Sequence, residues 1–335
     1  MIQLSAPILQ GYEWKNSLAQ AIRDPVELLK ILELPPSLLP NAKSAAQSFP
    51  LRVTHSYLKR IKKGDPNDPL LRQILPLADE LKNVRGYNHD PVGDLPAQKS
   101  PGLLHKYHGR VLLVATGACG IHCRYCFRRN YPYTESNPLH DNWPVVIDYL
   151  EKNTEVNEII LSGGDPLSLS DQRLKKLVHD LEHIQHLGTL RIHTRLPIVL
   201  PQRVNQELLQ WIKATRFKVV LVLHVNHANE IDTDVKSAMA TLKKTGATLL
   251  NQSVLLKGVN DSTNDLKELS HALFDAHILP YYLHQLDKVS GAAHFAVADQ
   301  TATQLMAELR QQLPGYLLPR LVKEQASEPN KLPLF

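Results

Sequence analysis

From residue 110 onward, short apolar segments rich in β-branched residues alternate with longer segments whose apolar residues recur every three to four positions. The first pattern is typical of buried strands and the second of helices with one face on a core. The predicted strands are Arg110–Ala115, Glu158–Leu161, Leu190–Thr194, Lys218–His224, Thr248–Leu255 and Leu279–His284. The predicted helices are Trp143–Lys152, Ser170–Ile184, Arg203–Thr215, Asp232–Thr245, Ser262–Ala276 and Asp299–Leu313.

Six strands interleaved with helices favour parallel pairing with right-handed crossovers. The predicted fold is therefore α/β, a partial (βα)6 barrel of TIM-like architecture. It is two units short of a closed eight-stranded barrel.

The first hundred residues differ, because helical spacing in segments such as Ser17–Leu32 gives way to proline-rich turns at 65–69 and 90–101. We predict an N-terminal helical region and a linker that wraps the barrel over 1–100. The barrel itself is predicted over 101–296, and a C-terminal helix and tail over 297–335. The tail has no periodicity, which by itself is typical of disorder.

Composition narrows the class of protein. Hydrophobic residues make up 43% of the chain and charged residues 21%, as in ordinary globular proteins. No apolar run is long enough to span a bilayer, and the N-terminus lacks the basic and apolar blocks of a secretory signal. The net charge is +5, but basic clusters such as Tyr57–Gly64 are short and typical of solvated helix faces. We expect a cytoplasmic protein without a nucleic-acid or membrane partner.

Polar, glycine-rich or metal-binding residues follow or end each of the six predicted strands. In barrels of alternating strands and helices, the loops after the strands build the active site. The sequence therefore predicts a site across the barrel mouth. Its segments are Cys119, Ser162–Leu167, His193–Pro197, His224–Glu230, Asn251–Ser253 and His284–Asp287.

The three cysteines of the chain, Cys119, Cys123 and Cys126, lie in one short loop. Their odd number and a reducing compartment disfavour a disulfide. Structural zinc takes four ligands, and His122 or His105 can in principle complete such a set. An iron–sulfur cluster is normally held by four thiolates, so three would leave one iron open to a small molecule.

The spacing Cys119-x3-Cys123-x2-Cys126, with Tyr125 before the last cysteine, resembles the radical S-adenosylmethionine signature. The resemblance implies a [4Fe–4S] cluster whose fourth iron binds S-adenosylmethionine, which is cleaved to a 5′-deoxyadenosyl radical. It also implies a reductant protein such as flavodoxin or ferredoxin. "SGGDPL" resembles the second motif of these enzymes, a glycine-rich turn that supports the amino group of the cofactor. The residues expected to contact cofactors on this ground are Ser162, Gly163, Gly164, Asp165, His193, Arg195, His224, Asn251 and Gln252.

Over roughly residues 50 to 335, the motifs "CRYCFRR", "IHTRLPIVLPQRV", "HVNHANE", "NQSVLLKGVND" and "YYLHQLDKVSGAAHF" resemble the lysine 2,3-aminomutase family. These enzymes move an amino group from C2 to C3 of an amino acid with pyridoxal phosphate and the adenosyl radical. No side-chain base removes an unactivated C–H hydrogen, whereas a primary carbon radical does. The cofactors therefore supply the chemistry, while the protein orients and shields them.

The resemblance assigns a role to the tail. It identifies Lys331, in "SEPNKLPL", as the lysine that anchors pyridoxal phosphate, and it implies that the tail is tucked into the barrel mouth. Without the resemblance, a solvated tail lysine would be favoured. Pro329 and Asn330 stand where some members of the family have glycines.

The remaining roles follow from the same resemblance. Arg128 matches the residue that binds the α-carboxylate of the substrate, against the alternative of a solvated surface cation. Asp287 matches an acid that pairs with the far amino group of lysine, although alone it can equally cap a helix, and Glu324 approximates a second acid. The residues expected at the phosphate and ring of the pyridoxal cofactor are Lys106, Arg110 and Tyr107.

Two features resemble a shorter subfamily that makes (R)-β-lysine from L-lysine for attachment to translation elongation factor P. No cysteine lies outside the cluster loop, so a zinc site between subunits is not expected, and the sequence ends four residues after Lys331. The implied partner is the ligase that attaches the product. The alternatives are an aminomutase that makes a free β-amino acid as a solute or catabolite or acts on another amino acid, and a zinc-containing binding module.

Overall fold

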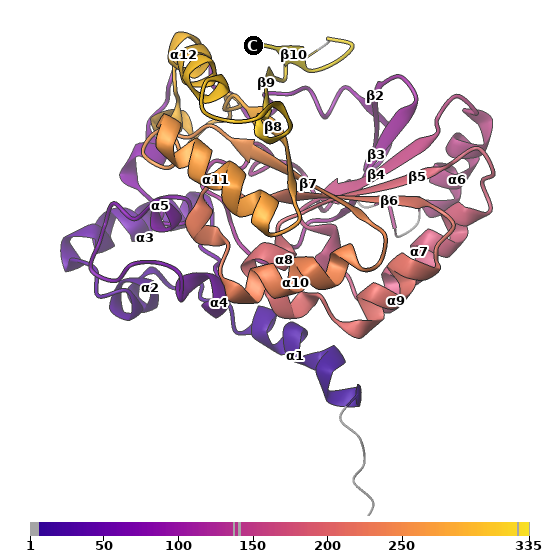
Figure 1. Ribbon diagram of the computed structural model, residues 1–335, viewed down its shortest axis with the longest axis horizontal. Helices are drawn as coiled ribbons and strands as arrows, with labels where there is room; N and C mark the ends of the chain where they lie inside the picture. Colours follow the sequence, from indigo (N-terminus) through magenta and orange to yellow (C-terminus); the bar gives the residue numbers. More distant parts are fainter. Residues whose placement is uncertain (1–6, 137, 140–141, 327, 335) are drawn as a thin grey trace, which may run out of the picture.

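The structure is a computed structural model that describes residues 7–136, 138–139, 142–326 and 328–334. Its centre is a ten-stranded sheet whose strands follow one another in sequence order from β1 to β10. Strands β3 to β9 are parallel, and helices cover the outer face of the sheet (Figure 1). The parallel strands are β3 (Arg110–Thr116), β4 (Glu158–Gly163), β5 (Thr189–Thr194), β6 (Lys218–His224), β7 (Thr248–Val254), β8 (Leu279–His284) and β9 (Arg320–Lys323).

The sheet is open, because its first and last strands do not pair with each other. Strands β1 (Gln98–Ser100) and β2 (Leu103–Tyr107) form an antiparallel hairpin before β3, and β10 (Leu332–Pro333) folds back on β9. The six predicted strands are β3 to β8, so the predicted partial barrel is confirmed. The structure adds β1, β2, β9 and β10, which have three, five, four and two residues and were not predicted from the sequence.

The predicted helices are also present. Helix α7 shows why they form: Ser170 caps its N-terminus by accepting a hydrogen bond from the backbone of Arg173, while Leu174, Leu177 and Leu181 share one buried face. The helices between and after the parallel strands are α6 (Trp143–Lys152), α7 (Asp171–Glu182), α8 (Leu196–Val199), α9 (Gln206–Ala214), α10 (Thr233–Lys243), α11 (Thr263–Asp275) and α12 (Asp299–Arg310).

The N-terminal region is helical, as predicted, and α2 to α5 lie together at one side of the barrel (Figure 1). Arg60 attaches this region to α8 by donating from Nη2 to the carbonyl of Ile198 at 2.7 Å, and Thr54 donates to the carbonyl of Val199. The helices are α1 (Pro7–Ala19), α2 (Pro25–Ile31), α3 (Leu39–Ser48), α4 (His55–Leu58) and α5 (Pro69–Arg72).

The linker before β1 crosses the loop that follows β8. The backbone N–H of Asn88 donates to the carbonyl of Lys288 at 3.0 Å, and its carbonyl accepts from Ser290 at 2.8 Å. This part of the linker therefore pairs with the loop at the carboxyl end of β8. No helix in the described ranges has the length and apolar character needed to cross a membrane.

Candidate active site

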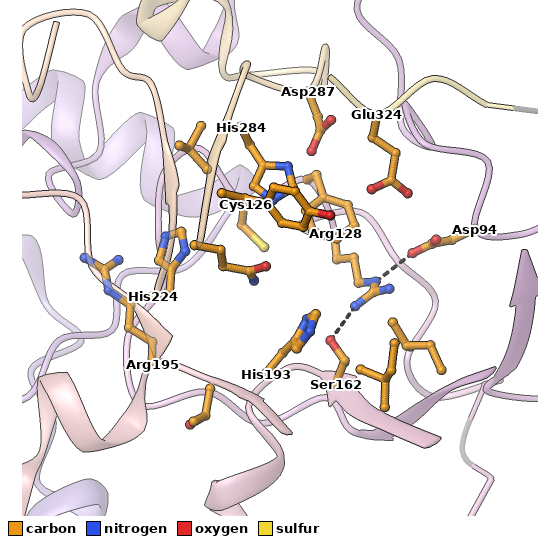
Figure 2. A pocket seen from close by; sticks show the side chains of 18 of the residues that line it. Asp94, Cys126, Arg128, Ser162, His193, Arg195, His224, His284, Asp287 and Glu324 are labelled. Atoms are coloured by element: carbon orange, nitrogen blue, oxygen red, sulfur yellow. Dashed lines mark hydrogen bonds and ion pairs between the residues drawn. The ribbon is translucent and has the colours of Figure 1, made fainter. Parts of the chain in front are cut away.

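A cavity of about 690 Å³ lies inside the partial barrel and reaches the carboxyl ends of the strands. Figure 2 shows side chains from strands, from the linker and from the tail pointing into it. The structure brings together in its wall all but one of the predicted site residues: Lys106, Tyr107, Arg110, Cys119, Cys123, Cys126, Arg128, Ser162, Gly163, Gly164, Asp165, His193, Arg195, His224, Gln252, Asp287, Glu324 and Lys331.

The exception is Asn251. Alternate residues of a strand face opposite sides of a sheet, so Gln252 and Val254 line the cavity, whereas Asn251 and Ser253 face away from it. The amide of Asn251 accepts from the backbone N–H of Val225 at 2.9 Å and donates to the carbonyl of the same residue at 3.1 Å. The structure thus corrects the expected position of Asn251, which ties β7 to the end of β6.

Contacts with the N-terminal region fix the cysteine loop. Arg124, which lies between Cys123 and Cys126 in sequence, is fully buried and donates to both carboxylate oxygens of Glu80 at 2.8 and 2.6 Å. Arg129 donates to the same carboxylate at 2.9 Å. Glu80 belongs to a short 3-10 helix, η2 (Ala78–Leu81), so a buried ion triad joins this helix to the loop.

The glycine-rich turn after β4 lies directly against the same loop. The N–H of Gly164 donates to the carbonyl of Thr116 at 2.7 Å, and the N–H of Asp165 donates to that of Ala118 at 2.7 Å. A Cβ atom on Gly164 would lie 2.5 Å from the carbonyl oxygen of Ala118, which is too close for any other residue. The second motif therefore needs a glycine at 164 to approach the thiols.

Asp165 connects this turn to β5 and α8. Its carboxylate accepts hydrogen bonds from the backbone N–H groups of Arg195 at 2.7 Å and Leu196 at 2.8 Å, and from the hydroxyl of Thr194 at 2.6 Å. These donors place Asp165 in the cavity wall with its oxygens directed at protein groups. Its structural effect is to fix the position of Arg195.

The thiols share one cavity wall but are not arranged around a single ion. Among the described residues, no three His, Cys, Asp or Glu side chains are placed to hold one metal ion. Burial and the neighbouring Cys123 raise the pKa of Cys126 to about 11, and burial also raises the pKa of Cys119. Coordination to iron would hold these sulfurs as thiolates.

The two histidines that were considered as zinc ligands have other partners. Nδ1 of His122 is 2.8 Å from the carbonyl oxygen of Pro50, and Nδ1 of His105 is 2.7 Å from the hydroxyl of Tyr149. His122 lines the cavity and His105 does not. His105 therefore lies outside the wall that carries the thiols, and the three thiols share that wall with His122 alone of the two.

A chain of alternating charges runs along another part of the cavity wall. Nε of Arg128 donates to Asp94 at 2.6 Å, and Nζ of Lys106 donates to the other oxygen of Asp94 at 2.5 Å. Lys106 is 3.4 Å from Glu324, which pairs in turn with Lys331. The tail lysine thus lines the cavity, next to the pairing of β10 with β9.

Arg128 is a cavity residue rather than a surface cation. Its side chain is 6% exposed, and Nη1 donates to the hydroxyl of Ser162 at 2.9 Å (Figure 2). Its guanidinium carbon lies 4.8 Å from the centre of the Phe127 ring. With Nε on Asp94 and Nη1 on Ser162, the planar fork has a fixed orientation, which suits recognition of a carboxylate.

The two predicted substrate-binding acids differ in charge. Burial and the neighbouring Glu324 raise the pKa of Asp287 to about 7. Burial also opposes ionisation of Glu324, but the charges of Lys331 and Lys106 outweigh it and lower its pKa to about 2. Glu324 is therefore ionised at neutral pH. Asp287 is partly protonated there, and a bound cation would favour its ionised form.

Three histidines of the cavity are neutral. Burial lowers the pKa of His224 to about 3, and burial with nearby cations, Lys331 among them, lowers the pKa of His193 and His284. Nε2 of His224 is 2.8 Å from the hydroxyl of Tyr125, next to the last thiol in sequence. Neutral imidazoles can donate or accept single hydrogen bonds to a bound cofactor without adding charge.

Asp94 is a charged residue of this site that sequence analysis missed. It is 2% exposed, yet it lies in the segment "DPVGDLPAQKSP", whose prolines and glycine indicate only a loop. Its acidic character alone did not distinguish it from the neighbouring Asp90. No periodic signal marks a loop residue that folds into a cavity.

Comparison with known proteins gives a consistent result. Residues 108–195 match a family model described as a 4Fe-4S single cluster domain. L-lysine 2,3-aminomutase of Escherichia coli (strain K12) is 48% identical over 96% of this chain and 94% of that protein. The enzyme of the same name from Haemophilus influenzae is 46% identical over 97% of this chain and 96% of that protein. A third, from Acetoanaerobium sticklandii, is 35% identical over 96% of this chain and 78% of its own length.

Among solved structures, a radical SAM methyltransferase from Sphaerobacter thermophilus is similar with a TM-score of 0.48 and 16% identity, over 66% of this chain and 68% of that one. The sequence relatives decide the family, since they span nearly the whole of both chains at 46% and 48% identity. The protein belongs to the L-lysine 2,3-aminomutase family of radical S-adenosylmethionine isomerases.

Proposed function

We propose that the protein is an L-lysine 2,3-aminomutase that depends on a [4Fe–4S] cluster, S-adenosylmethionine and pyridoxal phosphate, and that it makes (R)-β-lysine for the modification of elongation factor P. One observation carries the proposal. A fixed guanidinium, two carboxylates, a tail lysine and three thiols line a single cavity. This set matches the two ends of lysine and the attachment points of two cofactors.

The cavity fits the proposed cluster and S-adenosylmethionine. Cys119, Cys123 and Cys126 would hold three irons, and Gly163 and Gly164 let the turn after β4 pack against the thiol loop, because a side chain on either would strike the loop backbone or Val114. When bound, the cluster and S-adenosylmethionine would supply the one-electron chemistry that gives a radical able to remove hydrogen from C3 of lysine. A protein such as flavodoxin or ferredoxin would deliver that electron.

The opposite charges around Lys331 fit a pyridoxal phosphate anchor. Glu324 and Lys331 pair directly, and Tyr107 and Arg110 face the same cavity, with the Arg110 guanidinium 4.7 Å from the centre of the Tyr107 ring. Arg110 and Lys106 supply cations for the phosphate. The cofactor would delocalise the unpaired electron during migration of the amino group.

The substrate groups follow from the charges. Arg128 would bind the α-carboxylate, and Asp287, with Glu324 near it, would bind the far ammonium group. Glu324 already pairs with Lys331 and Lys106, so Asp287 is the acid that a substrate ammonium would pair with, which favours lysine over amino acids with a neutral or acidic side chain.

Anaerobic reconstitution tests the chemistry. Protein loaded with iron, sulfide and pyridoxal phosphate is given S-adenosylmethionine, a chemical reductant and L-lysine, and β-lysine is measured by chiral chromatography. Lys331→Ala should abolish turnover and leave the cluster absorbance intact. Lys323→Ala, a change to a half-buried lysine of β9 that pairs with Asp299 at 3.2 Å and does not line the cavity, should retain turnover. Zinc without iron or acid-labile sulfide in anaerobically purified protein would overturn the proposal.

The physiological role has separate support and a separate test. The chain has three cysteines, all in the loop, and it matches nearly the full length of the two relatives at 46% and 48% identity, as expected for the shorter subfamily. Deletion of the gene should remove the β-lysyl group from elongation factor P, as measured by intact mass. Unchanged modification with loss of free β-lysine would favour a solute or catabolic role instead.

A further inference from the structure

Arg195 is joined directly to one of the three thiols. Its Nη1 donates to Sγ of Cys123 and to the hydroxyl of Tyr125, each at 2.8 Å. Its Nη2 donates to Gln73 and Glu230, each at 2.7 Å. The residue is 5% exposed, so these contacts lie away from solvent.

Glu230 balances the charge of Arg195 at this place. Its side chain has no exposed surface, and the attraction of Arg195 and backbone hydrogen bonds keep its pKa below the ordinary value despite burial. Oε1 accepts from the backbone N–H of Asn226 at 2.9 Å and from the side chain of Gln73 at 3.2 Å. The pair therefore presents a strong donor to the sulfur while adding no net charge.

The guanidinium has little freedom to leave this position. Asp165 fixes the Arg195 backbone through a 2.7 Å hydrogen bond, and the rings of Tyr57 and Tyr125 lie 5.5 and 6.0 Å from the guanidinium carbon. The contact is thus held by Tyr57, Gln73, Tyr125, Asp165 and Glu230, which come from different parts of the chain. A donor fixed in this way does not need to reorganise when the charge on the sulfur changes.

We propose that Arg195 and Glu230 together set the reduction potential of the cluster bound at Cys123. The inference rests on the proposed function, because it requires that cluster. Hydrogen bonds to the sulfurs and the net charge nearby both control the potential of iron–sulfur clusters. Arg195 donates to a thiolate that becomes more electron-rich on reduction and so favours the reduced form. Glu230 limits this effect by cancelling the positive charge.

The two residues therefore predict shifts of opposite sign. Glu230→Gln leaves a positive charge beside the cluster and should raise the potential. Arg195→Gln removes the charged guanidinium donor and leaves the negative charge of Glu230, so it should lower the potential. We expect the ratio of reduced to oxidised cluster at a fixed solution potential to change about tenfold in each case, which is about 59 mV for one electron.

The measurement is a redox titration of reconstituted protein without S-adenosylmethionine. The electron paramagnetic resonance signal of the reduced cluster monitors this titration. The matched control is Asp171→Asn, which removes the acid from a comparably buried pair, Arg203–Asp171 at 2.9 Å, with side-chain exposures of 0% and 2%. Arg203 and Asp171 do not line the cavity, so this variant should titrate like wild type. Shifts of the same sign in both test variants, or no shift with normal iron content, would overturn the proposal.

If either variant fails to bind iron, a second measurement tests whether the Arg195 guanidinium contacts the cluster. Wild-type protein labelled with ¹⁵N only in its arginine guanidinium groups should show a nitrogen coupling in pulsed resonance spectra of the reduced cluster, and Arg195→Lys should lose it. Absence of the coupling in wild type would overturn the assignment. A wild-type protein that binds no iron–sulfur cluster would instead reject the proposed function, so the two failures are distinguishable.

Discussion

Asp94 accepts a 2.6 Å hydrogen bond from Nε of Arg128, and this contact links the linker before the barrel to the loop that carries the thiols. The same carboxylate holds Lys106 at 2.5 Å. Asp94 therefore orients one cation expected at the substrate carboxylate and another expected at the cofactor phosphate. A single loop residue connects the two halves of the site.

Asp94→Asn should weaken lysine binding, because a charge-assisted bond to Arg128 is lost and the guanidinium can turn. Such bonds contribute about 1.5 to 3 kcal/mol, so the dissociation constant for lysine should rise about tenfold or more. Titration of the pyridoxal absorbance with lysine measures it. Asp79→Asn, at a surface pair with Lys82, serves as the control. An unchanged affinity of Asp94→Asn for lysine would show that Ser162 alone orients the Arg128 guanidinium.

Gly164→Ala should prevent assembly of the cluster. The added Cβ would lie 2.5 Å from the carbonyl oxygen of Ala118 and push the thiol loop away from β4. Gly188→Ala is a matched control, since a Cβ there meets no atom within 4 Å. Iron and acid-labile sulfide per chain are measured after anaerobic reconstitution, and a full complement in Gly164→Ala would refute the close contact.

Lysine binding should weaken below neutral pH. Asp287 has a pKa of about 7 in the empty cavity, so it is protonated at lower pH and cannot pair with the ammonium group until it loses that proton. The dissociation constant should rise by up to tenfold per unit as the pH falls below about 7. Calorimetry in buffers of different ionisation enthalpy would also detect the released proton.

Asp287→Asn provides the control for this pH dependence. The variant should bind lysine more weakly and lose the dependence, since no group with that pKa remains at the position. A dependence that persists in Asp287→Asn would assign the titration to another residue.

Glu80→Gln should destabilise the fold and the cluster loop together. Removing the acid leaves Arg124 and Arg129 buried beside each other without a counter-charge. Breaking a buried pair in this way costs about 3 to 5 kcal/mol. Asp148→Asn, in a surface pair with Lys152, should change the free energy of unfolding by less than about 1 kcal/mol. Denaturant titration of the metal-free proteins compares the two.

The barrel was predictable from the sequence because its signal is local. Strands such as β6, with the sequence "KVVLVLH", are short apolar runs, and helices such as α7 begin at a capping serine. The position of the thiols followed from their spacing, and the position of Lys331 followed from the family resemblance. Each of these inferences depends on neighbouring residues or on a short motif.

The contacts that organise the site were not predictable in the same way. Glu80 and Arg124 are 44 residues apart, Asp94 and Arg128 are 34 apart, and the intervening sequence gives no period that relates them. Strands β9 and β10 have only four and two residues, so their pairing depends on β8 and on each other. These features arise when distant segments pack, which a single sequence does not encode locally.

Lys106 and Glu324 meet across 218 residues of chain. Contacts between such distant segments cost the most loop entropy and tend to form late in folding. The cysteine loop can therefore fold before Glu324 and the tail close the cavity. Iron and sulfide would reach the thiols during that interval, before the ion pairs of Glu324 with Lys106 and Lys331 form.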